Sequence, residues 1–451
     1  MRNLVAIGCG GAGMFSLIVA NQLRKGKFTA TVLSDEQDVY CRCTSPYILT
    51  GEAELADAIQ PECMFADYGL TIVHDRAVRI DTRQRVVVGE SGTEYPYDSL
   101  VVATGARAFV PPIPGADGAR VHTVRTSEDM EHIGREAADA KHAVVIGVGV
   151  IGMEMAGALR EKGVGVTLVE ASAGISSDLA DPEFAERLVS HLKERGIETV
   201  FSGTVTGIRD DASGRKEVVV KTGDTERVIG TDLVIVAAGV RPNLDVVEGS
   251  GIRTSKQGIP VDDRMRTNVS DVYACGDCSM PPFGVTGEHR SSGLASGAIQ
   301  QAKIVGFQLA GFPIRYKGST GAAAFRTLGR EFAVAGLTET AARERFRFVV
   351  TGVAETTDVY RDLKGNRPLS VKLVFAGPRL RLVGYQAFGN GVIASADVAS
   401  FAIGQRTGIL RMLRYNYIAH PSLSPWPFMD PIIMATEDAM GKLMKRFSRT
   451  K

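Results

Sequence analysis

The sequence has few cysteines, a single tryptophan, no long apolar run and almost no net charge. Six cysteines among 451 residues are too few for the disulfide framework of a small secreted protein. Lysine plus arginine (52) nearly balance aspartate plus glutamate (51), which leaves a net charge of +1. Nucleic acids and membrane surfaces are therefore not expected partners. No segment approaches the ~18 uninterrupted apolar residues of a membrane-spanning helix.

These absences favour a reducing, cytoplasmic compartment. The N-terminal apolar run Leu4–Ile7 leads straight into glycines and lacks a small-residue cleavage site, so we expect a strand there rather than a signal peptide. In such a compartment, cysteines that lie close together in the sequence are more often catalytic than structural. The length allows two or three domains.

Glycine, by contrast, is abundant, with 50 residues, and its first cluster has the GxGxxG spacing. This motif consists of Gly8, Gly10 and Gly13. The first glycine permits a tight turn, the second lets a pyrophosphate approach the backbone, and the third lets a helix starting near Met14 pack on the strand. A second strand, Thr29–Leu33, ends just before Asp35, whose carboxylate is expected to bind ribose hydroxyls.

A second copy of this pattern follows the strand Ala143–Ile146. Its residues are Gly147, Gly149 and Gly152, followed by Glu154. The next strand, Val166–Val169, ends at Glu170, which would accept hydrogen bonds from both ribose hydroxyls and repel a 2′-phosphate. Two such units predict two dinucleotides, and Glu170 favours NADH over NADPH because no arginine stands nearby to bind a 2′-phosphate.

Three further strand ends carry small or acidic residues. Ala103, Thr104 and Gly105 end the first of these strands, and Gly239 ends the strand that starts at Asp232. The third strand ends at Gly276 and Asp277, and a carboxylate at that place can bind the ribityl hydroxyls of a flavin. Pro111–Gly115 and Val240–Asn243 are expected to be crossings between domains.

Taken in this order, the two glycine motifs, Ala103–Gly105 and Tyr273–Asp277 resemble the FAD-dependent pyridine nucleotide-disulfide oxidoreductases. The resemblance implies an α/β fold with two Rossmann-like dinucleotide-binding domains and a C-terminal α+β dimerisation domain. The implied FAD domain comprises residues 1–113 and 244–316, the NAD(H) domain residues 114–243, and the dimerisation domain residues 317–451. FAD, NADH and a homodimer are implied with it. Strands near Val371–Phe375 and Leu380–Tyr385, and later helices, are expected in the last domain.

Cys43 lies in the stretch Tyr40–Tyr47, about thirty residues after the first glycine motif. The position five before it is Asp38, so the cysteine pair of enzymes resembling dihydrolipoamide dehydrogenase is absent. The spacing is similar to the single-cysteine branch: coenzyme A-disulfide reductases, NADH peroxidases, NADH oxidases and polysulfide reductases. That resemblance implies that Cys43 is the redox cysteine beside the flavin. Ser45 and Pro46 predict a helix start, which would lower the pKa of a nearby thiol.

Cys41 departs from that branch, and several roles are compatible with it. It is a resolving thiol or half of a strained, easily reduced disulfide with Cys43, a soft-metal ligand together with Cys43, or a packing residue. The motifs call for no metal. Cys275 and Cys278 have a CxxC spacing, but their place in the flavin motif favours coincidence, and Cys9 is expected to be simply a small residue in the first turn.

The segment from His420 to Ser424 is similar to the His-Pro-Thr-Leu-Ser-Glu element of dihydrolipoamide dehydrogenase-like enzymes, in which the histidine serves the active site of the other subunit as acid-base catalyst. Pro425 replaces the glutamate. His420 is therefore either a proton donor to a leaving thiolate or an interface residue. Tyr417 and Tyr360 fall near the positions of the partner tyrosines of coenzyme A-disulfide reductases, and packing is their alternative role.

The resulting expectation is an FAD-dependent NADH oxidoreductase. It would pass electrons through Cys43 to a small-molecule disulfide, persulfide or polysulfide, coenzyme A disulfide included. Oxygen or peroxide as acceptor is one alternative, and carbon–sulfur chemistry on a thiol-linked substrate is another. A redox-sensing or scaffold flavoprotein with slow turnover is the alternative outside enzymes.

Overall fold

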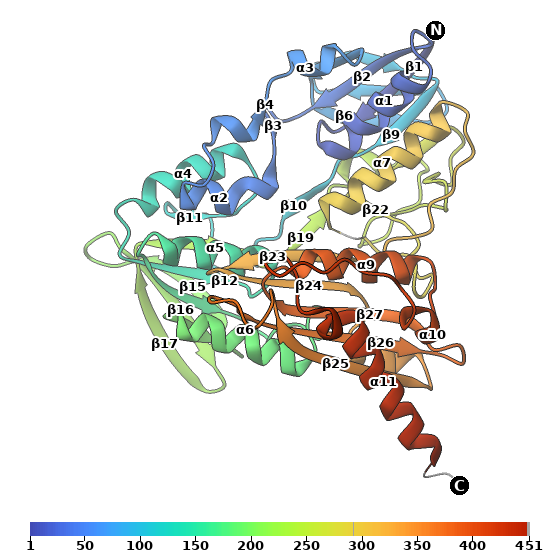
Figure 1. The fold of residues 1–451 in the computed structure, drawn as a ribbon. Coiled ribbons are helices and arrows are strands. Elements are labelled where there is room, and N and C mark those ends of the chain that lie inside the picture. The colour runs from blue at the N-terminus through green and yellow to red at the C-terminus, as the bar shows by residue number, and fades with distance from the viewer. Residues whose placement is uncertain (292, 449–451) are drawn as a thin grey trace. The chain divides into compact units, whose positions relative to one another are not determined.

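The computed structural model describes residues 1–291 and 293–448 (Figure 1). The chain divides into two compact units. The first consists of residues 1–109, 123–134 and 239–319, and the second of residues 110–122, 135–238 and the described residues from 320 onward. Each unit is therefore assembled from segments that are far apart in the sequence.

The first unit is built around a parallel five-stranded sheet in the order β21-β9-β1-β2-β5. These strands are β1 (Arg2–Ile7), β2 (Phe28–Ser34), β5 (Leu70–His74), β9 (Ser99–Val102) and β21 (Val272–Ala274). Helix α1 (Gly11–Leu23) joins β1 to β2 and packs on α7 (Ala295–Leu309). The packing is close, because a Cβ on Gly306 of α7 would lie 2.6 Å from the Cβ of Val19.

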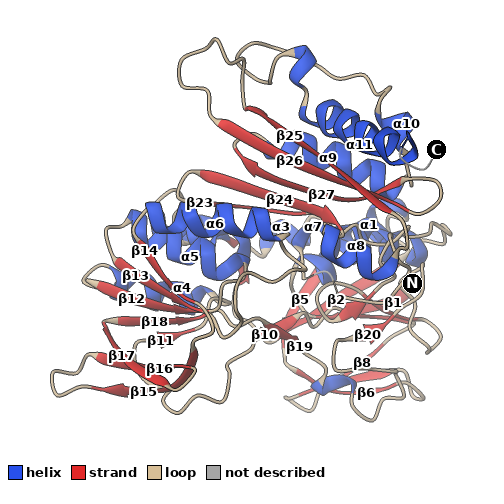
Figure 2. Cartoon of the chain, turned by 90° about the horizontal axis from the view of Figure 1, so that it is seen from below, coloured by secondary structure: helices blue, strands red, loops and turns tan. Residues whose placement is uncertain are grey.

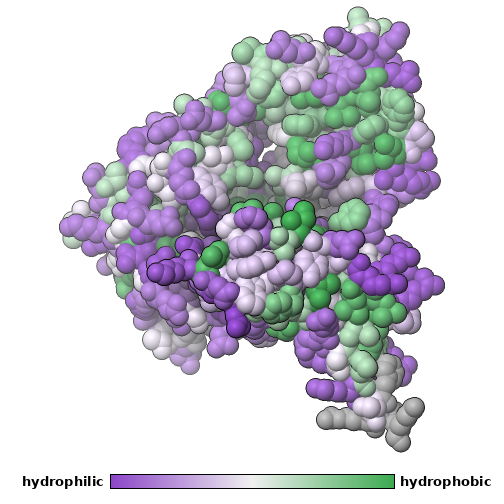
Figure 3. Space-filling model, in the orientation of Figure 1, coloured by the Kyte–Doolittle hydropathy of each residue, from purple (hydrophilic) through white to green (hydrophobic). Residues whose placement is uncertain are grey.

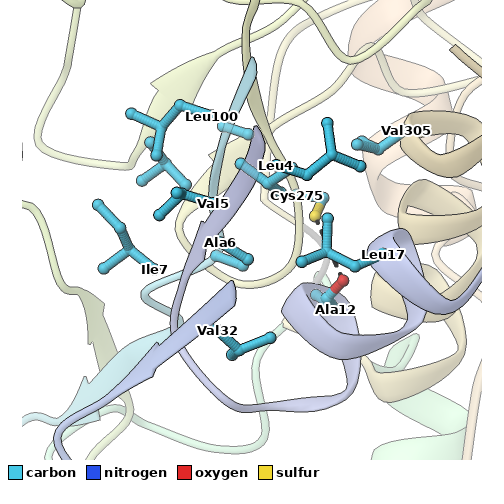
Figure 4. Packing of buried hydrophobic residues seen from close by; sticks show 14 of the residues in the cluster. Leu4, Val5, Ala6, Ile7, Ala12, Leu17, Val32, Leu100, Cys275 and Val305 are labelled. Atoms are coloured by element: carbon cyan, nitrogen blue, oxygen red, sulfur yellow. Dashed lines mark hydrogen bonds between the residues drawn. The ribbon is translucent and has the colours of Figure 1, made fainter. Parts of the chain in front are cut away.

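Apolar side chains from this sheet and its helices form one buried core (Figure 4). Leu4, Leu17, Leu100 and Val305 are completely buried in it. Strands β1, β2 and β9 contain runs of consecutive buried residues and are therefore buried on both faces, as expected for a parallel sheet covered by helices. Burial of this apolar surface is the main force that holds the motif-bearing turns at the strand ends in place.

Short elements complete the first unit. They are β3 (Val39–Tyr40), β4 (Ile59–Gln60), β6 (Ala77–Asp81), β7 (Val86–Gly89), β8 (Glu94–Pro96), β10 (Ala106–Ala108), β19 (Val240–Pro242), β20 (Ile259–Pro260), β22 (Ser279–Met280), α2 (Ser45–Thr50) and α3 (Cys63–Ala66). Strands β10 and β19 pair antiparallel, so the expected crossing at Val240–Asn243 runs beside the segment that precedes the other expected crossing, Pro111–Gly115. Helix α4 (Ser127–Ala137) begins in the first unit.

The second unit contains another parallel sheet, in the order β11-β18-β12-β13-β14. Its strands are β11 (Val121–His122), β12 (His142–Ile146), β13 (Gly165–Val169), β14 (Ile197–Val200) and β18 (Leu233–Val236). The helices of this part are α5 (Val150–Glu161) and α6 (Pro182–Glu194). A separate antiparallel sheet comprises β15 (Thr204–Asp210), β16 (Lys216–Thr222) and β17 (Thr225–Thr231). The order β18-β12-β13-β14 repeats the order β9-β1-β2-β5 of the first unit, with β12 in the place of β1. The expectation of two Rossmann-like folds is confirmed.

The C-terminal part of the second unit is an antiparallel sheet in the order β23-β24-β27-β26-β25 with helices packed beside it (Figure 2). The strands are β23 (Ala323–Thr327), β24 (Arg330–Gly336), β25 (Val349–Thr357), β26 (Pro368–Ala376) and β27 (Arg381–Gly389), and the helices are α8 (Glu339–Arg345), α9 (Val392–Gly404), α10 (Ile409–Met412) and α11 (Pro431–Ser448). This confirms the predicted α+β domain. Within the described residues, none of the helices has both the length and the apolar character that a membrane crossing requires.

Candidate flavin, nicotinamide and thiol site

The first glycine turn has the shape that a dinucleotide pyrophosphate requires. Gly8 has a φ of +108°, and a Cβ there would clash with the backbone of Ala103. A Cβ on Gly13 would clash with the carbonyl oxygen of Gly8, whereas one on Gly10 would meet nothing within 4 Å. The first and third positions are thus closed by the fold, and the second is open for a ligand at the N-terminus of α1.

The second glycine turn repeats this geometry. Gly147 has a φ of +107°, and a Cβ there would clash with the backbone of Ala237. Gly152 packs against the carbonyl oxygen of Gly147, and Gly149 again has nothing within 4 Å of its Cβ position. Both turns therefore fit a dinucleotide.

The acidic residues that follow β2 and β13 are placed differently relative to the glycine turns. Gly147 N–H donates to Val169, and Gly8 N–H donates to Leu33, both at 2.8 Å. By this register Ser34 corresponds to Glu170. Glu170 accepts hydrogen bonds from the N–H groups of Val148 (3.0 Å) and Ser172 (2.8 Å), so its carboxylate is fixed at the glycine turn. Asp35 lies one residue beyond the corresponding position and is exposed, and its role in binding ribose stays a prediction.

The predicted flavin residues of the first unit converge on one place. Asn243 accepts a hydrogen bond from the Thr104 hydroxyl at 2.6 Å through its carbonyl oxygen, and donates one to the Thr104 carbonyl at 2.9 Å through its amide. Gly276 has a φ of +80°. Asp277 lies 3.6 Å from a guanidinium nitrogen of Arg125, and this same nitrogen lies 3.5 Å from where a Cβ on Gly105 would be.

Sequence reasoning missed Arg125. Burial, followed by the nearby charge of Arg42, lowers its pKa, while Asp277 acts in the opposite direction. Arg125 stands in no recognisable motif, and only the fold brings it to residues 105 and 277. A half-buried cation at this place is suited to an anionic part of the cofactor.

Cys43 lies in the 3-10 turn Arg42–Thr44, and α2 begins two residues later at Ser45. The predicted helix start is confirmed, with Pro46 in its first turn. The turn is fixed by hydrogen bonds of the Ser45 hydroxyl with the Arg42 carbonyl (2.9 Å) and the Tyr40 hydroxyl (2.8 Å). Cys43 and Cys41 are both exposed, and neither forms a disulfide.

The other cysteines near the predicted flavin site are poorly suited to redox chemistry. Burial raises the pKa of Cys9 to about 12. Cys275 and Cys278 are completely buried, burial raises the pKa of each thiol, and each donates to a backbone carbonyl, as Cys275 does to Ala12 in Figure 4. Because the thiolate is the reactive form, burial makes the thiols of Cys275 and Cys278 poorly suited to redox or metal chemistry.

The C-terminal candidates lie together in the second unit. The backbone N–H of Tyr360 donates to the Pro421 carbonyl at 3.0 Å, and the Tyr360 ring contacts the Trp426 ring edge-on, with 5.9 Å between centroids. The Tyr417 hydroxyl donates to the Pro427 carbonyl. In place of the missing glutamate, Ser422 approaches Nδ1 of His420 with its hydroxyl (3.2 Å) and its N–H (3.4 Å).

Glu154 lies on α5, two residues after the last glycine of the second turn. Burial raises its pKa to about 7, against the lowering influence of Arg326. A carboxyl group that titrates near neutral pH beside a nucleotide turn can hold a proton under working conditions.

Family comparisons agree with this geometry. Residues 2–302 match the model of the pyridine nucleotide-disulphide oxidoreductases, and residues 325–427 match the dimerisation domain of that family. The chain belongs to the pyridine nucleotide-disulphide oxidoreductase family. It is accordingly an oxidoreductase that uses FAD and NADH, and the two glycine turns have the shape that a dinucleotide site requires.

Relatives within the family have different printed activities. An NADH oxidase of Methanocaldococcus jannaschii is 29% identical over 457 residues, which cover 99% of this chain and 100% of that protein. The NAD-dependent persulfide reductase from A. fulgidus superposes with a TM-score of 0.91 at 29% identity over 98% of this chain and 84% of that one. Reduced CoADR-RHD from Bacillus anthracis gives a TM-score of 0.91 at 25% identity over 98% and 81%. The family is thus certain, and the acceptor of this oxidoreductase is a separate question.

Proposed function

We propose that this oxidoreductase transfers electrons from NADH, by way of FAD and Cys43, to a small-molecule disulfide, persulfide or polysulfide. The observation that carries the proposal is the contrast among the cysteines. Cys43 is exposed, belongs to a turn held by hydrogen bonds, and lies two residues before the start of a helix. Burial, by contrast, raises the pKa of Cys9, Cys275 and Cys278, so these thiols are less reactive.

The chemistry proposed for Cys43 is thiol–disulfide exchange. Its thiolate attacks one sulfur of the acceptor R–S–S–R′, forms a mixed disulfide and releases R–S⁻, which takes up a proton. Bound FAD supplies the two-electron exchange between NADH and sulfur. The net reaction is NADH + H⁺ + RSSR′ → NAD⁺ + RSH + R′SH, with Cys43 regenerated.

His420 is the proposed proton donor to the departing thiolate, from the partner subunit. Support comes from its contacts with Ser422: an N–H that donates to Nδ1 leaves Nε2 as the protonated, donating nitrogen. Tyr417 and Tyr360 are proposed to line the same entrance and to donate hydrogen bonds to the acceptor, and Cys41 to be a secondary thiol of the turn.

The domain division is part of the proposal: residues 1–113 and 244–316 bind FAD, residues 114–243 bind NADH, and residues 317–451 form a homodimer. The match to the family's dimerisation domain at residues 325–427 supports the last assignment. Apolar side chains also gather on the surface over this part of the chain (Figure 3), where Ile393, Phe401 and Leu410 are more than half exposed. We propose a reducing, cytoplasmic compartment because the chemistry starts from a thiol.

The test is an anaerobic NADH titration of wild-type protein and Cys43→Ser, followed by flavin absorbance. With a redox-active Cys43, roughly two electron equivalents enter before the flavin bleaches and a long-wavelength thiolate–flavin band forms. Cys43→Ser should lose both features and keep its FAD. Cys63→Ser, which changes another exposed cysteine of the first unit, is the matched control and should behave as wild type. Bleaching of the wild-type flavin with the first equivalents, without the band, would contradict the proposal.

Oxygen is the second candidate acceptor, because the M. jannaschii relative that matches over the whole chain is an NADH oxidase. Initial rates of NADH consumption with polysulfide, with coenzyme A disulfide and with oxygen alone separate the two candidates. A sulfur acceptor predicts rates well above the oxygen rate and a dependence on Cys43. Slow turnover with every acceptor would instead favour a redox-sensing flavoprotein.

A further inference from the structure

Gln301 on α7 is completely buried, and only the oxygen of its carboxamide has partners. Oε1 accepts a hydrogen bond from the backbone N–H of Gly276 at 2.8 Å and lies 2.8 Å from the hydroxyl of Ser279, which is completely buried too. The Nε2 atom is also buried and, among the described residues, has no hydrogen-bond partner. A buried N–H group without an acceptor costs free energy, so an apolar side chain would fill this space more favourably than glutamine. What the polar side chain contributes is its bond to Gly276.

The turn that Gln301 binds leads directly into Asp277, the acidic residue predicted to bind the flavin. Gly276 has a φ of +80°, and a Cβ there would lie 2.9 Å from the Cβ of Ala12 on α1. The preceding residue, Cys275, donates its thiol to the Ala12 carbonyl at 3.7 Å (Figure 4). The turn is thus in contact with both α1 and α7.

Glycine makes this turn possible and also makes it easy to distort. A glycine adopts many backbone conformations at similar energy, so the angles at Gly276 must be fixed by contacts with other residues. The Ser279 hydroxyl lies 2.9 Å from the Gly276 carbonyl and supports the turn on that side. On the N–H side the acceptor is Oε1 of Gln301. Without it, a buried N–H would be left unsatisfied, and the turn would rotate toward another acceptor and move the Asp277 carboxylate.

We propose that Gln301 is a positioning residue for the flavin, which holds the Gly276 turn and thereby the carboxylate of Asp277. This role rests on the flavin-binding role predicted for Asp277 and is independent of the acceptor on which Cys43 acts. Gln301 itself is assigned no contact with the cofactor. Asp277, whose side chain is 21% exposed, is joined to Gly276 by one peptide bond, so a change in the Gly276 angles reaches its carboxylate directly.

The experiment measures the dissociation constant of FAD for the holoenzyme by equilibrium dialysis, with flavin fluorescence as the signal. Gln301→Met keeps the length of the side chain and removes its oxygen, and we expect it to bind FAD roughly tenfold more weakly. In Gln301→Glu, burial favours the protonated carboxyl, whose carbonyl oxygen can accept from Gly276, so this variant should recover most of the affinity. Gln300→Met is the matched control, because Gln300 is an exposed neighbour on the same helix, and it should bind FAD as wild type does.

A double-mutant cycle with Asp277→Asn separates positioning from a general loss of stability. If Gln301 acts through Asp277, Gln301→Met weakens FAD binding much less in the Asp277→Asn background than in wild type. Losses that multiply across the two substitutions, or wild-type affinity of Gln301→Met, would overturn the positioning role while leaving Asp277 as a flavin residue. Wild-type affinity of Asp277→Asn would instead refute the flavin role of Asp277, and the positioning role with it. Gln301→Asn, whose oxygen is withdrawn by one methylene, takes the place of Gln301→Met in the cycle if that variant does not fold.

Discussion

Lys372 on β26 is expected to be the most sensitive single position for the stability of the second unit. Its side chain is 3% exposed, and its ammonium group lies 3.0 Å from Asp181, 2.8 Å from Glu339 and in contact with Glu183. Asp181 and Glu183 stand at the start of α6 in the nucleotide-binding part, whereas Lys372 and Glu339 belong to the C-terminal sheet and its helix α8. One buried cation thus joins two parts of the unit.

The magnitude follows from what Lys372→Met leaves behind. Burial pushes the pKa of Asp181 upward, but N–H donors of Glu339 and Thr340 together with Lys372 outweigh this and lower it. Removing one partner of a buried ion pair costs about 3–5 kcal/mol of unfolding free energy. Asp181 would keep its bonds from Glu339 (2.8 Å) and Thr340 (3.0 Å), and Glu183 is 47% exposed, so we expect about 3 kcal/mol.

Urea denaturation of the wild type and Lys372→Met measures this loss. We expect a lowered midpoint and, in thermal scans, a fall in Tm of roughly 6–12 °C for a unit of this size. Lys442→Met is the control, since Lys442 pairs with Asp438 at a site where the lysine is 47% exposed, and should cost less than about 0.5 kcal/mol. Equal effects of the two substitutions would refute the reasoning. Asp181→Asn combined with Lys372→Met should recover part of the loss.

Two further predictions concern the nucleotide-binding part. Burial raises the pKa of Glu154 from 4.5 to about 7, so the folded state holds this proton more tightly than the unfolded state does. Stability should therefore fall by about 3 kcal/mol in total as pH rises between these values. In urea melts at pH 5 and pH 8, Glu154→Gln should lack this component, and a stability difference between the two pH values equal to that of wild type would contradict the assignment. Gly152→Ala should lower stability by about 1–3 kcal/mol because its Cβ would clash with Gly147. Gly149→Ala should melt as wild type but bind NADH at least tenfold more weakly in a fluorescence titration. Equal NADH affinity of Gly149→Ala and wild type would refute a pyrophosphate at Gly149.

The sequence determined the features whose cause is local. A strand, a GxGxxG turn and a helix are close in the chain, and the backbone at Gly8 and Gly147 needs the positive φ that glycine adopts readily. The start of α2 at Ser45 and Pro46 is likewise a local effect. These signals, taken in order, were enough to predict the family, the fold class and both cofactors.

Tertiary structure decided what depends on register and on contacts between distant segments. Pairing of β1 with β2 places Ser34, not Asp35, at the position corresponding to Glu170, and no spacing rule reveals a shift of one residue. Folding also brings Arg42 near Arg125 and sets Lys372 among three carboxylates. None of these residues belongs to a motif, because their roles come from burial and from the low-dielectric interior, where charges must find partners that the chain supplies from far away.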